Sequence, residues 1–420
     1  MRIEDFSRDS RGNRTRVAAT VIWEDCDRPS QEIYYETTHE FADDLTCDPH
    51  AFLIACILPA LQLGERRITM SEPIAPELRN NLLEALAWFR RWTLVQSTIQ
   101  IEVKDEPRYP QAIPSRTGSF LSGGIDSLAI LRANRCDFPL THPRAIGDCL
   151  FVHGFDMGGL QDGDAEVDSF TLALNALSSI AKDAQVNLIP VYTNVRHLCD
   201  DLHFWIYQFH GAALSSVAHA FSRRLTSVSI ASAYKIQNLR NKTTHPLIEP
   251  NYSSANLRIS VGGLLYSRLE RVQMIANWPI ALENLRVCTL NPPGELNCGE
   301  CEKCIRTMLQ LLASDCLAKA SAFPRQEVRP EMLETLHLTE PYQDLWYGEL
   351  IEPLAARGHQ DLVDIIQEKR TEFRKYLMWK EERDWKGAVK RFDRRYLGGN
   401  LFGAYKATRT ALGKGNSHAS

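Results

Sequence analysis

The side chains best suited to chemistry lie in one short run, SGGIDS, at residues 122–127. Its two glycines let the backbone turn tightly and approach a ligand closely, and the amide N–H groups of such a turn attract an anion. Its two serines add hydroxyl donors. Asp126 would repel a bare phosphate, so its presence predicts a Mg²⁺ ion that bridges the carboxylate and the phosphates. The run therefore predicts a phosphate-binding loop.

The residues that follow the run exclude one common type of phosphate-binding loop. No Gly-Lys-Ser or Gly-Lys-Thr follows the run, so it is not a Walker A loop. The alternative interpretation is an ordinary turn that caps a helix, with two incidental glycines. That alternative predicts no ligand at residues 122–127.

Four of the 11 cysteines crowd into a short segment with the spacing C-x9-C-x2-C-x2-C: Cys288, Cys298, Cys301 and Cys304. In a reducing compartment this clustering indicates a metal rather than disulfides. Four thiolates at about 2.3 Å suit a structural Zn²⁺ ion, which has no open position and folds the segment instead of doing chemistry. An iron–sulfur cluster and four buried free cysteines remain the alternatives.

The elements that must position these residues alternate in type. Short apolar runs predict parallel strands, and helical patterns separate them. The predicted strands are 118–121, 149–153, 186–191 and 227–231, and the predicted helices are 127–135, 164–183 and 204–222. This order predicts an α/β fold with a doubly wound parallel sheet, which binds ligands beyond the carboxyl ends of its strands. His203, just before the last helix, and His210 and His219 within it are interpreted as core or boundary residues. The alternative is a catalytic histidine, with His210 as the first candidate because Gly211 follows it.

The regions on either side predict further domains. Residues 1–110 predict an N-terminal α/β region, and a proline-rich linker follows at 106–116. Its predicted strands are 16–24, 32–38 and 97–103, and its predicted helices are 49–63 and 76–92. The expected division is an accessory domain at 1–110, a nucleotide-binding domain at 117–287, a cysteine segment at 288–325 and a helical, basic region at 330–420.

Composition excludes several classes of protein. Among 420 residues, 44% are hydrophobic and 24% charged, which is typical of globular proteins. No run of 18 apolar residues predicts a membrane helix, and the polar start lacks a signal peptide, so we expect a cytoplasmic protein. The net charge is −4, although residues 368–414 hold 14 Lys and Arg against 6 Asp and Glu. A bulk nucleic-acid binder is therefore not expected.

The run at 122–127, between a strand and a helix, resembles the SGGxDS signature of the PP-loop ATP pyrophosphatase superfamily. With the cysteine spacing, residues 117–315 resemble its 7-cyano-7-deazaguanine synthase branch. The resemblance implies an adenine nucleotide alpha-hydrolase-like fold, a Zn²⁺ ion on the four cysteines and Mg²⁺ on Asp126. It also implies that ATP contacts the phosphate loop and the strand at 149–153, through Ser122, Gly123, Gly124, Asp126, Ser127 and Val152.

The resemblance further implies an activity. Such enzymes split ATP into AMP and pyrophosphate, adenylate a carboxylate such as a deazaguanine-like acid, and let ammonia or an amine attack it to give an amide or nitrile. The additions at 1–110 and 330–420 have no counterpart in the simple synthase, and relatives with extra domains include antiphage-defence ligases that use a protein amine. The alternatives are a PP-loop sulfur transferase acting on tRNA or a small molecule, with Cys199 as the nearest reactive cysteine, and a non-catalytic protein that binds ATP and Zn²⁺. The oligomeric state stays open.

A second catalytic group is expected downstream of the loop. Ser267 and Glu270 form a capping box, which predicts a helix start and places Arg268 and Arg271 in its first turn. The resembling family has a basic residue in a similar turn. Arg268 is the candidate for stabilising charge on the α-phosphate and the departing pyrophosphate. The alternative is an exposed helix arginine.

Overall fold

The computed structural model describes residues 1–93, 97–106, 115–157, 164–241, 244–290, 292–334, 336–383 and 392–393. The chain divides into two compact units, Met1–Val328 and Arg329–Ser420. The phosphate loop, the four cysteines and the predicted N-terminal region all belong to the first unit.

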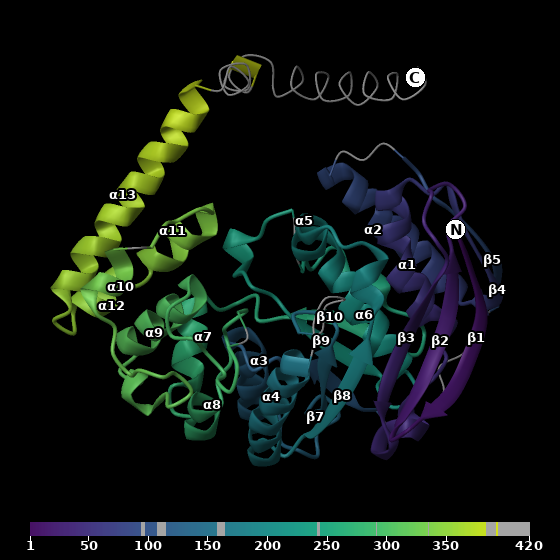
Figure 1. The fold of residues 1–420 in the computed structure, drawn as a ribbon, viewed down its shortest axis with the longest axis horizontal. Coiled ribbons are helices and arrows are strands. Elements are labelled where there is room, and N and C mark those ends of the chain that lie inside the picture. The colour runs from purple at the N-terminus through teal and green to yellow at the C-terminus, as the bar shows by residue number, and fades with distance from the viewer. Residues whose placement is uncertain are drawn as a thin grey trace. The chain divides into compact units, whose positions relative to one another are not determined.

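Ten of the described strands form one sheet in the order β10-β9-β6-β7-β8-β3-β2-β1-β4-β5 (Figure 1). The first five in chain order are β1 (Arg2–Arg11), β2 (Arg14–Ile22), β3 (Gln31–Thr38), β4 (Arg67–Ile74) and β5 (Gln100–Asp105). The others are β6 (Thr117–Phe120), β7 (Ile146–His153), β8 (Asn187–Thr193), β9 (Ser227–Ala231) and β10 (Arg258–Gly262). The predicted α/β class is confirmed.

The five strands β6 to β10 are parallel to one another, and their order reverses at β6. Ser119 of β6 lies opposite Cys149 of β7 on one side and Ser229 of β9 on the other. The chain runs from β6 outward through β7 to β8, then returns past β6 to β9 and β10. Such a reversal is where open α/β sheets bind ligands. The four predicted strands are found here, whereas the sequence did not predict β10.

The N-terminal strands continue the same sheet. β3 pairs with β8 in antiparallel register, with Tyr35 opposite Thr193, and β2 and β1 follow it. The predicted boundary near residue 110 therefore does not separate two sheets. Residues 107–114 of the predicted linker lie outside the described residues.

Helices of the first unit cover the sheet in two layers. α3 packs against α7 and α4 against α8, whereas α6 packs against α1. Right-handed crossovers place α3 and α4 on the opposite face from α6, because the strand order reverses between them. The helices are α1 (Pro49–Leu63), α2 (Pro76–Thr93), α3 (Ile125–Asp137), α4 (Asp164–Asp183), α5 (Leu202–Phe204), α6 (His210–Ala220), α7 (Arg268–Ile275), α8 (Pro279–Glu283) and α9 (Glu302–Ala313).

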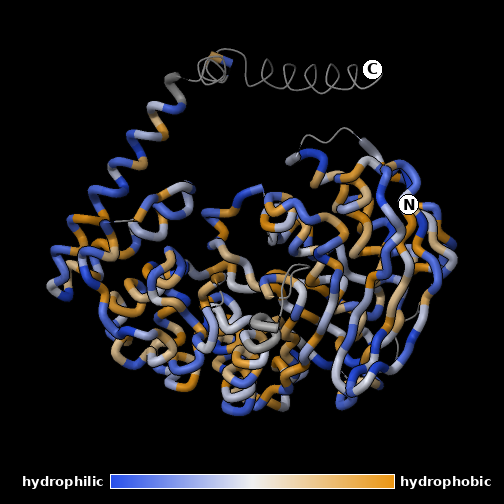
Figure 2. The backbone as a smooth tube through the Cα atoms, in the orientation of Figure 1, coloured by the Kyte–Doolittle hydropathy of each residue, from blue (hydrophilic) through white to orange (hydrophobic). Residues whose placement is uncertain are grey.

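Helix α1 shows how local sequence sets an element. Asp48 accepts the N–H of His50 at 3.1 Å as the N-cap, and Pro49 occupies the first position. The helix ends at Gly64, which adopts a φ of +87°. Its residues 49–61 are all buried, which places α1 in the core. Figure 2 shows that hydrophobic residues predominate along α1.

One predicted helix is interrupted. The sequence predicts a helix over 204–222, but a π-helical turn, Trp205–Phe209, separates α5 from α6. Trp205 and Phe209 are buried and lie edge to face with their ring centroids 5.9 Å apart. These two rings pack where the helix widens into the π-helical turn. Apolar spacing at 3.6 residues per turn does not reveal such a widening.

The described part of the second unit is helical. Its helices are α10 (Pro330–Glu334), α11 (Pro341–Gly348), α12 (Ile351–Ala355) and α13 (Gln360–Arg383). Asp344 of α11 pairs with Arg370 and Arg374 of α13 at 2.7 and 3.1 Å. Across both units, none of the described helices combines the length and the apolar character needed to span a membrane.

Candidate functional site

The phosphate loop lies at the carboxyl end of β6, between this strand and α3. Gly124 is the N-cap residue of α3, and Gly123 before it adopts a φ of +81°, a conformation that L side chains rarely adopt. A Cβ atom at Gly123 would lie 3.1 Å from Leu177 and 3.2 Å from the Cβ of Arg286. Conformation and space thus both require glycine at position 123.

The two serines brace the loop. The hydroxyl of Ser127 donates to the carbonyl of Gly124 at 3.0 Å, and the N–H of Gly124 donates to the hydroxyl of Ser122 at 3.3 Å. The two hydroxyl oxygens lie 3.3 Å apart. The structure therefore brings the predicted loop residues together in one turn at the reversal of the sheet.

Asp126 is held by two arginines from α7. Its Oδ2 accepts from Arg268 at 3.0 Å and its Oδ1 from Arg271 at 2.5 Å. Both arginines are buried, at 8% and 1% exposure, so the alternative of an exposed helix arginine does not hold. Ser267 forms the predicted capping box, which fixes the first turn of α7 that carries both guanidinium groups.

The charges of this trio reinforce one another. Burial raises the pKa of Asp126, but the charges of Arg268 and Arg271 outweigh that effect and hold the pKa below its usual value. Burial lowers the pKa of Arg268 to about 10. Asp126 and Arg268 are therefore both charged at neutral pH. Each carboxylate oxygen of Asp126 keeps a further lone pair, so coordination of Mg²⁺ stays a prediction.

Three further cations surround the loop, and the sequence analysis missed them. Arg286 donates its backbone N–H to the carbonyl of Gly123 at 2.9 Å. The charge of Arg306, which is 3% exposed, acts on Asp126, and the exposed ammonium of Lys303 acts on Arg268. We call the following five side chains the cation cluster: Arg268, Arg271, Arg286, Lys303 and Arg306. Arg286, Lys303 and Arg306 belong to no sequence motif, so the sequence alone could not identify them as site residues.

Strand β7 brings two further residues near the loop. Val152 pairs with Val191 of β8 and lies in the strand beside β6, so contact of its backbone with adenine stays a prediction. Asp156 follows β7 and is exposed, and its charge acts on Arg286, Lys303 and His210. Burial lowers the pKa of His210, which favours its neutral form.

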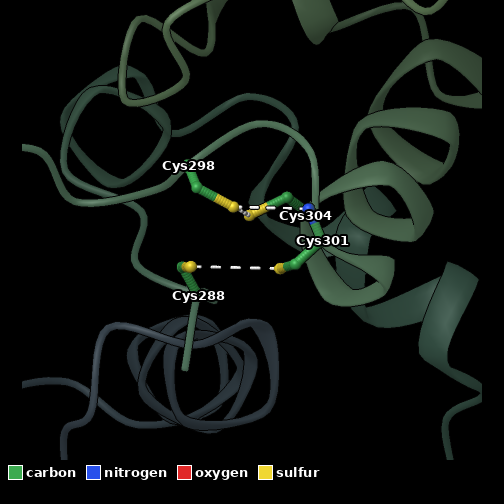
Figure 3. Close-up of side chains that lie close together, drawn as sticks. All are labelled: Cys288, Cys298, Cys301 and Cys304. Atoms are coloured by element: carbon green, nitrogen blue, oxygen red, sulfur yellow. Dashed lines mark hydrogen bonds between the residues drawn. The ribbon is translucent and has the colours of Figure 1, made fainter. Parts of the chain in front are cut away.

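The four predicted cysteines converge (Figure 3). The Sγ atoms of Cys288 and Cys301 lie 3.9 Å apart, as do those of Cys298 and Cys304, and all four lie within 4.8 Å of one another. One tetrahedral ion with metal–sulfur bonds of about 2.3 Å needs sulfurs about 3.8 Å apart. A cluster with several irons between the ligands would hold them farther apart. The geometry therefore fits a single ion such as Zn²⁺.

The surroundings of Cys301 favour a thiolate, the form that binds metals, whereas burial raises the pKa of Cys298. The backbone N–H groups of Glu300 and Cys301 donate to the sulfur of Cys298 at 3.5 and 3.3 Å. A hydrogen bond from the thiol of Cys304 lowers the pKa of Cys301 to about 5. The donor set thus fits the group that the spacing predicts.

A second cluster of potential ligands, Asp48, His50 and His219, is buried where α1 meets α6. The backbone N–H of Ala75 donates to Nε2 of His50 at 3.0 Å, so the proton of the neutral ring is on Nδ1, 3.4 Å from Asp48. His50 then offers no lone pair to a metal. His219 donates through Nε2 to the carbonyl of Tyr252 at 2.8 Å. The rings of His50 and His219 pack edge to face with their centroids 5.8 Å apart, which joins α1 to α6, and His219 is a core residue.

No protein-family model, curated protein or solved structure matches the chain. The resemblance to the PP-loop enzymes thus depends on residues 122–127 and on the cysteine spacing. The geometry around these two features carries the functional argument below.

Proposed function

We propose that the chain is an ATP-dependent ligase that forms AMP and pyrophosphate. One observation carries the proposal: the glycine turn lies at the reversal of the parallel sheet and faces Asp126, which is paired with two buried arginines. The proposal includes an adenine nucleotide alpha-hydrolase-like, doubly wound fold for the parallel half of the sheet. It also includes Zn²⁺ on the four cysteines.

The charge near the loop supports a polyphosphate ligand. Four members of the cation cluster, Arg268, Arg271, Arg286 and Arg306, are buried. Buried cations are stabilised by anionic partners. A triphosphate would be such a partner, and its oxygens would accept from the N–H groups of the turn and of the start of α3. Mg²⁺ on Asp126 would neutralise part of the phosphate charge.

The proposed reaction has two steps. A carboxylate oxygen of the acceptor attacks the α-phosphorus, the bond from that phosphorus to the bridging oxygen breaks, and pyrophosphate leaves with the electron pair. A nitrogen nucleophile then attacks the acyl carbon, AMP leaves, and the nitrogen releases a proton to solvent. Arg268 stabilises the charge that develops on the α-phosphate. Adenylation replaces a poor leaving group, hydroxide, by AMP.

The acceptor is proposed from the resemblance alone. A deazaguanine-like acid with ammonia gives an amide. A second ATP adenylates the amide oxygen and releases pyrophosphate; AMP then leaves with that oxygen, the nitrogen loses its two protons, and a nitrile results. A protein amine in an antiphage-defence setting would give a conjugate instead. Sulfur transfer is less well supported, because Cys199 is 5% exposed and burial raises its pKa.

The test is a product assay with the purified full chain. ATP, Mg²⁺, ammonia and a panel of purine-like carboxylic acids are supplied, and AMP and pyrophosphate are measured. We expect both products in equal amounts, dependent on one acid and lost in Asp126→Ala. Release of ADP, or no cleavage of ATP with any acid, would contradict the proposal. Cleavage that persists in Asp126→Ala would remove this carboxylate from the mechanism.

A further inference from the structure

The cysteine segment is joined directly to the phosphate loop. Arg286 lies two residues before Cys288, and its backbone N–H donates to the carbonyl of Gly123 at 2.9 Å. Buried Asn297 fixes this stretch, because its Oδ1 accepts from the N–H groups of Val287 and Cys288 at 2.9 and 3.2 Å. A metal bound to Cys288 would therefore fix the position of residues 286–288, which contact the loop through Arg286.

The same ligands define the start of α9. Cys301 is its N-cap residue and Cys304 lies in its first turn. Lys303 stands between these two ligands, and Arg306 follows two residues later. A metal that fixes both sulfurs also fixes the turn that carries both cations.

The two cations of α9 differ in their partners. Arg306 is buried and pairs with Glu302 at 3.0 Å, and its charge acts on Asp126 and Arg268. Lys303 is exposed, and among the described residues its ammonium has no hydrogen bond and no ion pair. Its helix, α9, packs against α7, which carries the two arginines that hold Asp126 of the loop. Lys303 is thus a cation on the helix next to this pair, and it keeps its donors for a ligand.

We propose that the metal on the four cysteines holds Lys303 against the phosphate loop, and that Lys303 binds the pyrophosphate portion of the nucleotide. This inference rests on the proposed function. The metal acts as a positioning element: it sets where α9 begins and where Arg286 contacts Gly123. Metal content would then control nucleotide affinity without contacting the nucleotide.

The first experiment measures binding of pyrophosphate and of α,β-methylene-ATP with Mg²⁺ by calorimetry. Lys303→Met is compared with Lys319→Met, an exposed lysine of the same segment. Loss of one charge-assisted contact should weaken both ligands by about 10- to 100-fold in Lys303→Met and leave Lys319→Met unchanged. Metal content by mass spectrometry should equal that of the unmodified chain in both variants. Equal affinity of the two variants overturns the role of Lys303.

The second experiment follows the metal. The full chain is stripped with a chelator, reloaded with Zn²⁺, and its amide hydrogen exchange is measured in both states. We expect faster exchange of the Arg286 amide and weaker binding of pyrophosphate in the stripped chain, both restored by Zn²⁺. Equal affinity and equal exchange in the two states overturn the coupling. Absence of nucleotide binding in the loaded, unmodified chain instead rejects the proposed function itself.

Discussion

Two aspartates of the first unit are each held by a pair of arginines, but at opposite ends of the parallel strands. Asp126 lies beside the glycine turn at the carboxyl end of β6. Asp148, near the amino end of β7, is fully buried and pairs with Arg116 and Arg224. The two sites have similar chemistry in different places, so each is a control for the other.

Replacing each aspartate separates catalysis from stability. Asp126 accepts two hydrogen bonds from its arginines and Asp148 accepts four. Asp126→Asn and Asp148→Asn both remove the charge that these bonds involve, and each should lower the free energy of unfolding by about 1 to 3 kcal/mol. We expect AMP formation to fall by about 100-fold or more in Asp126→Asn and to change less than about threefold in Asp148→Asn. Urea unfolding and the product assay measure the two effects. Equal losses of activity would assign Asp126 a purely structural role.

Glu249 is a buried acid whose stability contribution depends on pH. It is 2% exposed, and its Oε2 accepts the backbone N–H of His245 at 2.5 Å. A Cβ atom at Gly211 of α6 would lie 1.9 Å from its Oε1, so the glycine makes room for this carboxyl group. Burial raises its pKa to about 8.

This raised pKa predicts that the fold weakens as the pH rises. Between about pH 4.5, the ordinary value, and about pH 8 the folded chain binds the proton that the unfolded chain has lost, so stability declines with pH. Glu249→Gln should remove this part of the decline, which is about 1.4 kcal/mol per pH unit at most. Urea unfolding at pH 5, 6.5 and 8 measures it. The exposed Glu84→Gln should retain the decline, and identical slopes in all three proteins would contradict the prediction.

At the scale of elements, the strand–loop–helix unit around Gly123 combines a left-handed residue with close packing. Gly64, after α1, adopts a similar φ of +87° but a Cβ atom there would meet nothing within 4 Å. A comparison of Gly64 with Gly123 therefore distinguishes the effect of backbone strain from that of crowding.

Alanine at each glycine tests the two effects. Gly64→Ala should lower stability by about 1 kcal/mol, since only the left-handed conformation is strained. Gly123→Ala adds crowding against Leu177 and Arg286, so we expect a larger loss of stability and loss of pyrophosphate binding. Thermal unfolding and calorimetry check both variants. Pyrophosphate affinity that survives Gly123→Ala would show that the turn does not approach the ligand.

The elements that the sequence predicted are those whose signals are local. The predicted bounds of α1, α4 and β9 coincide with the structure, because caps, prolines and apolar periodicity mark them. The sequence did not predict β1, because its run RIEDFSRDSR is rich in charged residues and lacks the apolar alternation that marks a strand. The pairing of Asp126 with Arg268 and Arg271 joins residues more than 140 positions apart, and no local pattern encodes it.

At the scale of the molecule, the N-terminal strands β1–β5 and the parallel strands β6–β10 share one sheet and one core. β3 pairs with β8, α1 packs on α6, and Arg224 contacts both Asp44 and Asp148. The sequence predicted two regions because the chain between them is rich in proline. Strand pairing across such a distance in sequence leaves no trace in composition, so only the fold reveals it.

This continuity predicts how fragments behave. Residues 1–106 expressed alone should not fold, because β3 and α1 lose β8 and α6 as partners. Coexpression with residues 115–420 should give a complex that copurifies. Circular dichroism and hydrogen exchange measure folding of each fragment and of the pair. A folded, cooperative 1–106 fragment would show that the N-terminal half is an independent domain.

The junction of β3 with β8 also decides where another chain could add a strand. A five-stranded parallel sheet on its own would expose β8 as an edge, with unpaired backbone groups open to intermolecular pairing. Here β3 occupies that position, and the free edges among the described strands are β5 and β10. Any self-assembly by strand addition is therefore confined to the two ends of the sheet, far from the seam between its halves.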